Sequence, residues 1–285
     1  MIAIGLVLSS CGEAQPARSQ PVSQSQSKTG HAIIPVKVQK TPHGFQLLRG
    51  GKPYYLRGGG GLQEYDQLRE AGGNTVRLWS ADYAEPLLDE AHRQGLTVML
   101  GLWLEPEDEH FSYYDPAMVA AQLRRVREQV LRYRHHPALL MWNVGNELEI
   151  TARGPRFFTA INAIARMIHE LDPYHPVTIS MAIGFTEHAR LLQSVAPAVD
   201  ILSINVYGQL NKLPSLLKKS GWRGPYIVTE FGARGFWESD STSWKAPMEQ
   251  TSAEKAQFMS TLYRAIIEPD STRCLGSYAF LGLQV

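Results

Sequence analysis

The stretch "LLMWNVGNELE", residues 139–149, decides how this chain is expected to fold. It begins with a near-continuous apolar run, which is typical of a parallel strand buried on both faces. The run ends abruptly in Asn146, Glu147 and Glu149. A carboxylate buried at the end of such a strand costs several kcal/mol unless other groups compensate for its charge. The stretch therefore predicts a buried strand that ends at a functional site.

Seven more segments have strand character, and helical segments separate many of them. The eight predicted strands are residues 54–58, 74–79, 97–104, 139–145, 176–181, 201–208, 226–232 and 276–282. Amphipathic segments, expected to be helices, include residues 63–71, 85–94, 117–134, 156–170 and 253–267. In the fourth of these, apolar residues recur at spacings of three and four. Eight strands alternating with helices predict an α/β protein with a (β/α)8 barrel, the TIM-barrel architecture.

An open, doubly wound parallel sheet is the alternative to the barrel. Such a sheet would carry a glycine fingerprint for binding phosphate groups. The glycine run "RGGGG", residues 57–61, has neither GxGxxG spacing nor a Gly-Lys-Ser/Thr ending, and it is predicted to be a tight turn at a strand end. The sequence stops at Val285, directly after the eighth strand. The barrel is therefore expected to lack its last helix and to expose part of the outer face of strands eight and one.

The segments before the barrel predict a membrane-anchored protein. Residues 1–11 are a short apolar stretch, and "LSSC" at its end is similar to the lipobox of bacterial lipoproteins, in which Cys11 is lipidated. A Ser/Gln/Pro-rich stretch follows and predicts a disordered linker. We expect an extracytoplasmic lipoprotein, periplasmic or on the cell surface, that meets the membrane only through a lipid on Cys11. The predicted organisation is a signal, a linker, a β-hairpin at the barrel entry and the barrel, at residues 1–11, 12–30, 31–53 and 54–285.

The composition excludes several classes of partner and cofactor. The 285 residues are 44% hydrophobic and 19% charged with a formal net charge of +1, which fits a globular protein without the basic face that nucleic acid requires. The two cysteines exclude a disulfide framework, and Cys274 is predicted to be a buried thiol. His110, His135 and His136 lack a compact ligand spacing, so no metal or other cofactor is expected. The acidic run at residues 105–109 predicts a solvated loop.

Polar side chains gather at the predicted carboxyl ends of the strands, where barrel active sites form. Because side chains alternate along a strand, Arg77 is expected in the lumen, as are Asn205 and Tyr207. Glu147 and Glu230 end two different strands and would face each other across the mouth. Paired carboxylates that flank a cleft are what cleavage of a glycosidic bond requires, one protonated and the other ionised. The alternative is a structural ion pair between these carboxylates and Arg77.

Five segments resemble, in order, the strand motifs of the catalytic barrel of glycoside hydrolase family 2, within the clan of retaining (β/α)8-barrel glycosidases. They are "GGKPYYLRG", "GGNTVRLW", "HPALLMWNVGNELE", "INVYG" and "PYIVTEFG", and the resemblance runs from about residue 45 to the end. It implies that Glu147 is the general acid/base and Glu230 the nucleophile. It also implies that Asn146 bonds the sugar 2-hydroxyl and that Arg77 and Tyr207 hold the nucleophile.

The resemblance implies a retaining glycoside hydrolase that cleaves β-linked O-glycosidic bonds of oligo- or polysaccharides by double displacement. A transglycosylase with the same carboxylates and a catalytically inactive glycan-binding lipoprotein are the alternatives. Trp237 and Trp244 lie in the long loop after the seventh strand and are predicted to stack on sugar, although a loop packed on itself is an equal alternative. Trp79, Trp103 and Trp142 are predicted to lie in the core or the barrel wall.

Overall fold

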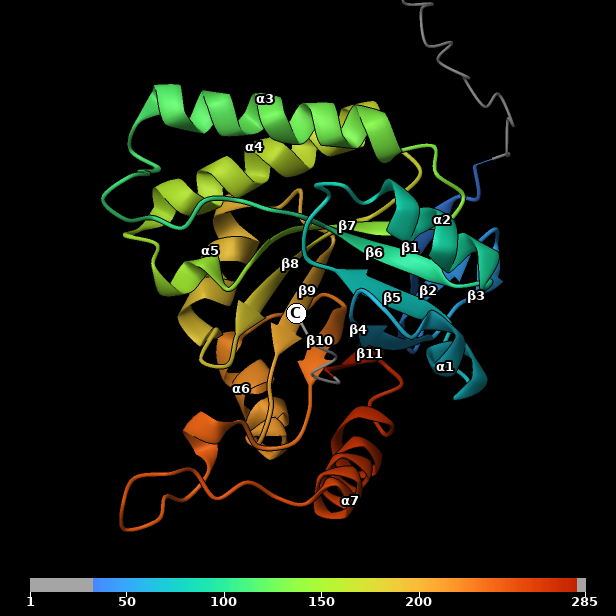
Figure 1. The fold of residues 1–285 in the computed structure, drawn as a ribbon. Helices are drawn as coiled ribbons and strands as arrows, with labels where there is room; N and C mark the ends of the chain where they lie inside the picture. The colour runs from blue at the N-terminus through green and yellow to red at the C-terminus, as the bar shows by residue number, and fades with distance from the viewer. Residues whose placement is uncertain (1–32, 281–285) are drawn as a thin grey trace, which may run out of the picture. The chain divides into compact units, whose positions relative to one another are not determined.

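The computed structural model describes residues 33–280, in which eight parallel strands close into a barrel (Figure 1). Around the barrel the strands follow the order β10-β11-β4-β5-β6-β7-β8-β9. Each of them overlaps one of the eight segments predicted from the sequence, so the predicted (β/α)8 barrel is confirmed. The strands are β4 (Leu56–Gly60), β5 (Thr75–Leu78), β6 (Thr97–Leu102), β7 (Leu139–Asn146), β8 (Val177–Ala182), β9 (Ile201–Asn205), β10 (Tyr226–Phe231) and β11 (Cys274–Phe280).

Helices cover the outside of the barrel between successive strands (Figure 1). They are α1 (Tyr65–Glu70), α2 (Glu85–Arg93), α3 (Pro116–Tyr133), α4 (Pro155–Leu171), α5 (Thr186–Val195), α6 (Leu213–Ser220) and α7 (Ser252–Leu262), which continues as a π-helical turn (Tyr263–Ile267). The five predicted helices correspond to α1 to α4 and α7. Helices α5 and α6, of ten and eight residues, are not among the helices that the sequence predicts.

Two apolar layers hold the barrel together. The larger lies between the strands and the helices, where α4 buries Phe157, Ile161, Ile164 and Ile168 as its repeat predicts. Burying one such side chain contributes about 1.5–3 kcal/mol relative to leaving it exposed. The smaller layer fills the lumen below the mouth with buried side chains that include Leu56, Met99, Met141, Ile201, Ile227, Leu275 and Tyr278. The polar residues at the mouth therefore lie above an apolar layer in the lumen.

The predicted hairpin is present and closes the amino-terminal end of the barrel. Its strands are β1 (Val36–Thr41) and β2 (Gly44–Arg49), and a short β3 (Lys52–Pro53) pairs with β2. Backbone hydrogen bonds join it to the segments that enter the barrel strands, from Val36 N to Tyr174 O (2.8 Å) and from Phe45 N to Thr272 O (2.7 Å). Val36 and Leu47 of the hairpin also pack against the inner apolar cluster, so the hairpin covers the end of the barrel opposite the carboxyl ends of the strands.

The glycine run at residues 57–61 is not the tight turn that the sequence predicts. Residues Arg57 to Gly60 belong to strand β4, paired with β5 and β11. A Cβ atom added at Gly58 would lie 2.2 Å from the ring of Tyr278, and one at Gly60 would lie 2.8 Å from the ring of Trp79. The prediction is wrong because the glycines make room for aromatic rings inside the barrel, a long-range requirement that local sequence does not report.

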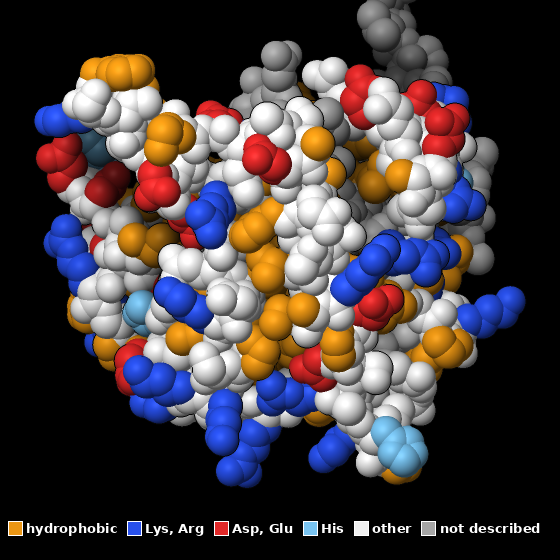
Figure 2. All heavy atoms as spheres, turned by 90° about the horizontal axis from the view of Figure 1, so that it is seen from below, with side chains coloured by type: hydrophobic (Ala, Val, Ile, Leu, Met, Phe, Trp, Pro, Cys, Tyr) orange, Lys and Arg blue, Asp and Glu red, His pale blue; other side chains and the backbone are white. Residues whose placement is uncertain are grey.

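A shallow hollow lies on the outer face of β4 and β11, between α1 and the end of α7. It is lined by Gly58, Leu68, Phe231, Tyr263 and Ser277, among others. Figure 2 shows the molecule from below with respect to Figure 1. On the face seen there, apolar side chains gather in the middle and Lys and Arg side chains lie around them.

Candidate active site

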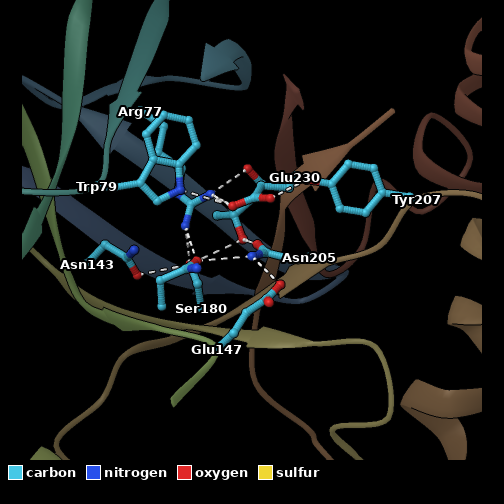
Figure 3. Close-up of polar contacts among 10 residues, drawn as sticks. Arg77, Trp79, Asn143, Glu147, Ser180, Asn205, Tyr207 and Glu230 are labelled. Atoms are coloured by element: carbon cyan, nitrogen blue, oxygen red, sulfur yellow. Dashed lines mark hydrogen bonds and ion pairs between the residues drawn. The ribbon is translucent and has the colours of Figure 1, made fainter. Parts of the chain in front are cut away.

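The predicted site residues meet at the carboxyl ends of four strands (Figure 3). Arg77 comes from β5, Asn146 from the end of β7, Asn205 from β9 and Glu230 from β10. Glu147 follows β7 directly. A hydrogen-bonded network joins these five side chains, so the structure brings together residues that lie more than 150 positions apart in the sequence.

Irregularities in β7 and β10 aim these side chains into the lumen. The β7–β8 register shifts between Asn143 and Asn146, and Gly145 adopts φ +78°, which a residue with a side chain rarely does. Both asparagines consequently face the lumen although they are three positions apart. A similar shift in the β9–β10 register lies between Val228 and Glu230. Such bulges are common next to active sites because they re-aim side chains.

Three hydrogen-bond donors surround the carboxylate of Glu230, which is only 6% exposed. Arg77 forms an ion pair with its Oε1, Trp79 Nε1 donates to the same oxygen at 3.0 Å, and the Tyr207 hydroxyl donates to Oε2. Burial and the negative charge of Glu230 raise the pKa of Tyr207 above its ordinary value, so the phenol keeps its proton and remains a donor. Both oxygens of the Glu230 carboxyl group thus accept from donors, and one of these donors is a guanidinium group, which can only donate.

The environment of Glu147 is different. Its side chain is half-buried, and Asn205 Nδ2 donates to Oε1 at 2.8 Å. Burial raises the pKa of Glu147 above its usual value of 4.5, and the negative charge of Glu230 raises it further, while the Asn205 hydrogen bond and the charge of Arg77 act in the opposite direction. The two carboxyl groups thus have different surroundings, because Glu230 accepts from three donors, one of them charged, whereas Glu147 accepts from one amide group.

The backbone of Glu147 is in the left-handed region, with φ 53° and ψ 27°. This conformation costs a residue other than glycine about 1–2 kcal/mol, so neighbouring contacts must hold it. One of them is the hydrogen bond from Glu147 N to Ser180 O, at 2.8 Å. Strain of this kind concentrates at functional sites.

Asn146 is oriented by two donors. Arg77 Nη2 donates to Asn146 Oδ1 at 2.6 Å, and Asn205 Nδ2 donates to the same oxygen at 3.0 Å. Since a guanidinium group can only donate, the amide oxygen must face it, and the Nδ2 group is left as a donor. The half-buried Asn146 can therefore donate to a hydroxyl group of a bound sugar, the contact that the family resemblance implies.

A second set of polar side chains supports this network from below. Ser180 Oγ accepts from Arg77 Nη2 at 3.3 Å and donates to Asn143 Oδ1 at 3.1 Å. Thr229 Oγ1 donates to Asn205 Oδ1 at 2.9 Å. Ser180, Asn143 and Thr229 are all buried, so the site rests on a rigid hydrogen-bonded layer.

The two tryptophans predicted to bind sugar lie differently with respect to the site. Trp237 is 61% exposed, and its ring meets the edge of Tyr207 with centroids 5.5 Å apart, which places it beside Glu230. Trp244 is 76% exposed. No ring contact between Trp244 and the site is found within residues 33–280. The structure thus joins Trp237 to the site through Tyr207, and within residues 33–280 it shows no such ring contact for Trp244.

Sequence reasoning missed several residues of the site. Trp79 is bonded to Glu230 instead of being a passive part of the wall, and Trp103, also predicted for the core or wall, is 46% exposed. Trp142 is buried as predicted. Phe280 meets the rings of Trp79 and Tyr207 at centroid distances of 5.9 and 5.6 Å. Trp79 shares the lumen-facing parity of Arg77, and that signal could have identified it.

Other expectations concern residues away from the site. His110 lies 3.3 Å from Glu109, and His136 lies 3.2 Å from Asp89. Over the part of the chain that the structure describes, no group of three or more His, Cys, Asp or Glu side chains could hold a metal ion. No helix there is both long and apolar enough to cross a membrane. Cys274 is buried. The predicted lipidation site, Cys11, and the linker lie outside the described residues.

Comparison with known proteins identifies the family. Residues 63–257 match the model of the glycosyl hydrolases family 2 TIM barrel domain. Human β-glucuronidase is 26% identical over 222 residues, which are 66% of this chain and 32% of that protein. The β-glucuronidase of Streptococcus agalactiae is 25% identical over 246 residues, 71% of this chain and 40% of that protein. The chain belongs to glycosyl hydrolase family 2, and it spans about a third of the length of the curated relatives it matches.

Solved structures show the same fold. The β-D-glucuronidase of Dictyoglomus thermophilum superposes with a TM-score of 0.65 at 22% identity, over 89% of this chain and 48% of that one. A β-galacturonidase from Eisenbergiella tayi, bound to galacturonate, gives a TM-score of 0.66 at 16% identity, over 87% of this chain and 46% of that one. At these identities the structural likeness concerns the barrel alone.

Proposed function

We propose that this chain is a retaining β-glycosidase that cleaves O-glycosidic bonds of oligo- or polysaccharides. The observation that carries the proposal is the contrast between the two carboxylates. Glu230 accepts from three donors, one of them a guanidinium group, whereas burial and the charge of Glu230 raise the pKa of Glu147. Glu230 is thereby suited to attack an anomeric carbon, and Glu147 to donate a proton to the leaving oxygen.

The proposed reaction proceeds in two displacements. In the first, a Glu230 oxygen forms a bond to the anomeric carbon while the bond to the leaving oxygen breaks and Glu147 protonates that oxygen. The charge of Glu230 disappears in the glycosyl-enzyme. Since that charge helps to raise the pKa of Glu147, its loss lowers this pKa and turns Glu147 into a base. In the second displacement Glu147 removes a proton from water, which attacks the anomeric carbon and releases Glu230.

Asn146 is proposed to stabilise the transition state by donating from Nδ2 to the sugar 2-hydroxyl, a contact that strengthens as positive charge develops on the ring. Arg77 and Tyr207 are proposed to hold Glu230 in position. The β configuration follows from relatives that are named β-glucuronidases. Attachment to a membrane through Cys11, outside the cytoplasm, is proposed from the sequence of residues 1–30 alone.

The experiment that tests the function is hydrolysis of a panel of aryl β-glycosides. The panel contains the glucuronide, galacturonide, glucoside and galactoside, and the matching α-anomers serve as controls. We expect release of the aryl alcohol from one β-glycoside with retention of configuration, read from the first-formed anomer by NMR. An inverted product would contradict double displacement. Repeating the assay with an added acceptor sugar distinguishes hydrolysis from transglycosylation, and sugar binding without any cleavage would favour the binding lipoprotein.

Glu147→Ala is expected to separate substrates by their leaving groups. Its kcat/KM should fall by about 10²–10⁴-fold on substrates with poor leaving groups, which need the proton, and by less than about tenfold on dinitrophenyl glycosides. In the wild type, activity should fall as pH rises through the pKa of Glu147, at a pH above 4.5 because burial raises this pKa. The variant should lose that alkaline limb. Equal losses on all leaving groups would contradict the acid role.

Trp237→Ala is expected to raise KM for oligosaccharides by about fivefold, because one stacking contact contributes about 1 kcal/mol. The effect of Trp244→Ala in the same assay should be smaller, because within residues 33–280 no ring contact joins Trp244 to Tyr207 or Trp237. Tyr174→Ala is the matched control, since Tyr174 is an exposed aromatic residue at the opposite end of the barrel. An unchanged KM for Trp237→Ala would remove this residue from the proposed binding site.

A further inference from the structure

The turn that carries Glu147 interrupts the pairing of β7 with β8. In a regular parallel ladder, a residue that donates its N–H to one carbonyl of the neighbouring strand accepts, at its own carbonyl, from the N–H two residues further along that strand. Glu147 N donates to Ser180 O, so the expected donor to Glu147 O is Ala182 N. In the structure, Ala182 N instead donates to Oε1 of Glu149, at 2.6 Å.

We propose that Glu149 is a positioning residue for Glu147. Its carboxyl group takes the place of the missing backbone acceptor and ties the turn to the end of β8, which keeps Glu147 in the left-handed conformation that directs it toward Glu230. The inference rests on the proposed function, in which Glu147 is the acid/base.

The burial of Glu149 supports a positioning role over one in general stability. The residue is 3% exposed, and within residues 33–280 its second oxygen, Oε2, has no hydrogen-bond partner. Burial raises the pKa of Glu149 to about 7, and the charge of Glu147 contributes to that rise. A carboxyl group that loses its hydration and forms few hydrogen bonds in exchange destabilises the fold, so packing alone does not explain its presence. Its advantage lies in the geometry that it imposes on the chain.

Glu107, in the loop after β6, provides a comparison because it bonds the end of the loop that carries Glu149. The sequence predicts that Glu107 lies in a solvated loop, but it is only 4% exposed, so that prediction is wrong. Its Oε2 accepts from Arg153 N at 2.7 Å and its Oε1 from Ser112 Oγ at 3.2 Å. Both oxygens of Glu107 thus have hydrogen-bond partners. They hold the loop between β7 and α4 at Arg153, next to α4, and not at the turn that carries Glu147.

The test compares Glu149→Met, Glu149→Gln and Glu107→Met. Methionine keeps the length of the side chain but offers Ala182 only a weak sulfur acceptor, whereas glutamine keeps an acceptor oxygen and removes the charge. Each variant is assayed on two aryl β-glycosides, one with a dinitrophenyl and one with a methoxyphenyl leaving group, and its thermal midpoint is measured.

For Glu149→Met we expect kcat/KM to fall by about 10–100-fold on the methoxyphenyl substrate and by less than threefold on the dinitrophenyl substrate, because a misplaced acid matters only where a proton is needed. Glu149→Gln should recover most of the loss. Glu107→Met should lower the thermal midpoint and affect both substrates equally.

Three outcomes would overturn the inference, and the first is distinguishable from the other two. If the wild type cleaves neither substrate, nor any other β-glycoside of the panel, the proposed function fails and the inference fails with it. If the wild type cleaves both but Glu149→Met matches it, or loses activity equally on both, only the positioning role of Glu149 is wrong. Failure of Glu149→Gln to recover activity would likewise exclude the acceptor role.

Discussion

Glu230→Ala is expected to lower kcat on every β-glycoside of the panel by at least about 10⁴-fold. Without the carboxylate no bond to the anomeric carbon can form, and the loss of a covalent nucleophile is among the largest single-residue effects known in enzymes. The fall in kcat should be as large on substrates with good leaving groups as on those with poor ones, in contrast to Glu147→Ala, because Glu230→Ala lacks the nucleophile and not the proton donor. Steady-state kinetics on dinitrophenyl and methoxyphenyl glycosides would show this difference directly.

Added azide provides the control that Glu230→Ala has a folded site. A small anion can occupy the space that the side chain leaves and attack the anomeric carbon in its place, which gives a glycosyl azide of inverted configuration in a single displacement. We expect this product from Glu230→Ala and, from Glu147→Ala, an azide product of retained configuration. Turnover of Glu230→Ala within about tenfold of the wild type, without azide, would show that the nucleophile is another residue.

The sequence predicted the barrel well because its evidence is local and repeated. Each strand is a short apolar run, and the repeat of Phe157, Ile161, Ile164 and Ile168 in α4 is regular enough to stand out from one helix alone. Once eight strands are present, the position of the site follows, since the carboxyl ends of parallel strands meet at one mouth. Glu147 and Glu230 could therefore be paired across the chain before any coordinates were known.

The details that the sequence did not yield depend on contacts between distant segments. The sequence around the glycine run does not predict that Tyr278 and Trp79 fill the space next to Gly58 and Gly60. Nothing in the acidic run reports that Glu107 is covered and bonded to Arg153. Acidic residues in a loop are usually solvated, and here the tertiary fold overrides that tendency.

The register shifts explain how adjacent residues serve one site. Strict alternation would send Thr229 and Glu230 to opposite faces of β10, yet Thr229 bonds Asn205 and Glu230 bonds Arg77, both at the mouth of the barrel. The shift in the β9–β10 register makes this possible. Bulges have weak sequence signatures, so parity arguments become unreliable at strand ends, where active-site residues lie.

Arg77→Met is expected to destabilise the fold as well as to impair activity. Arg77 is fully buried, with Nη1 on Glu230 and Nη2 on Asn146. Its replacement leaves the Glu230 carboxylate buried without a counter-charge, and breaking a buried pair from one side costs about 3–5 kcal/mol. Denaturant unfolding should show this loss as a lower midpoint with an unchanged slope. Arg77→Lys keeps the charge but cannot contact Glu230 and Asn146 with two separate nitrogens. The stability of this variant should therefore lie between those of the wild type and Arg77→Met.

The double variant Arg77→Met with Glu230→Gln decides whether the cost comes from the unpaired charge. A neutral glutamine next to methionine leaves no buried ion, and its single amide oxygen can still accept from the indole of Trp79 or from the hydroxyl of Tyr207, which contact different oxygens of Glu230. The double variant should therefore recover at least half of the stability lost in Arg77→Met, a positive coupling energy in the double-mutant cycle. If the two losses simply add, the destabilisation arises from the cavity around residue 77, and Arg77 acts as packing instead of as the counter-charge of Glu230.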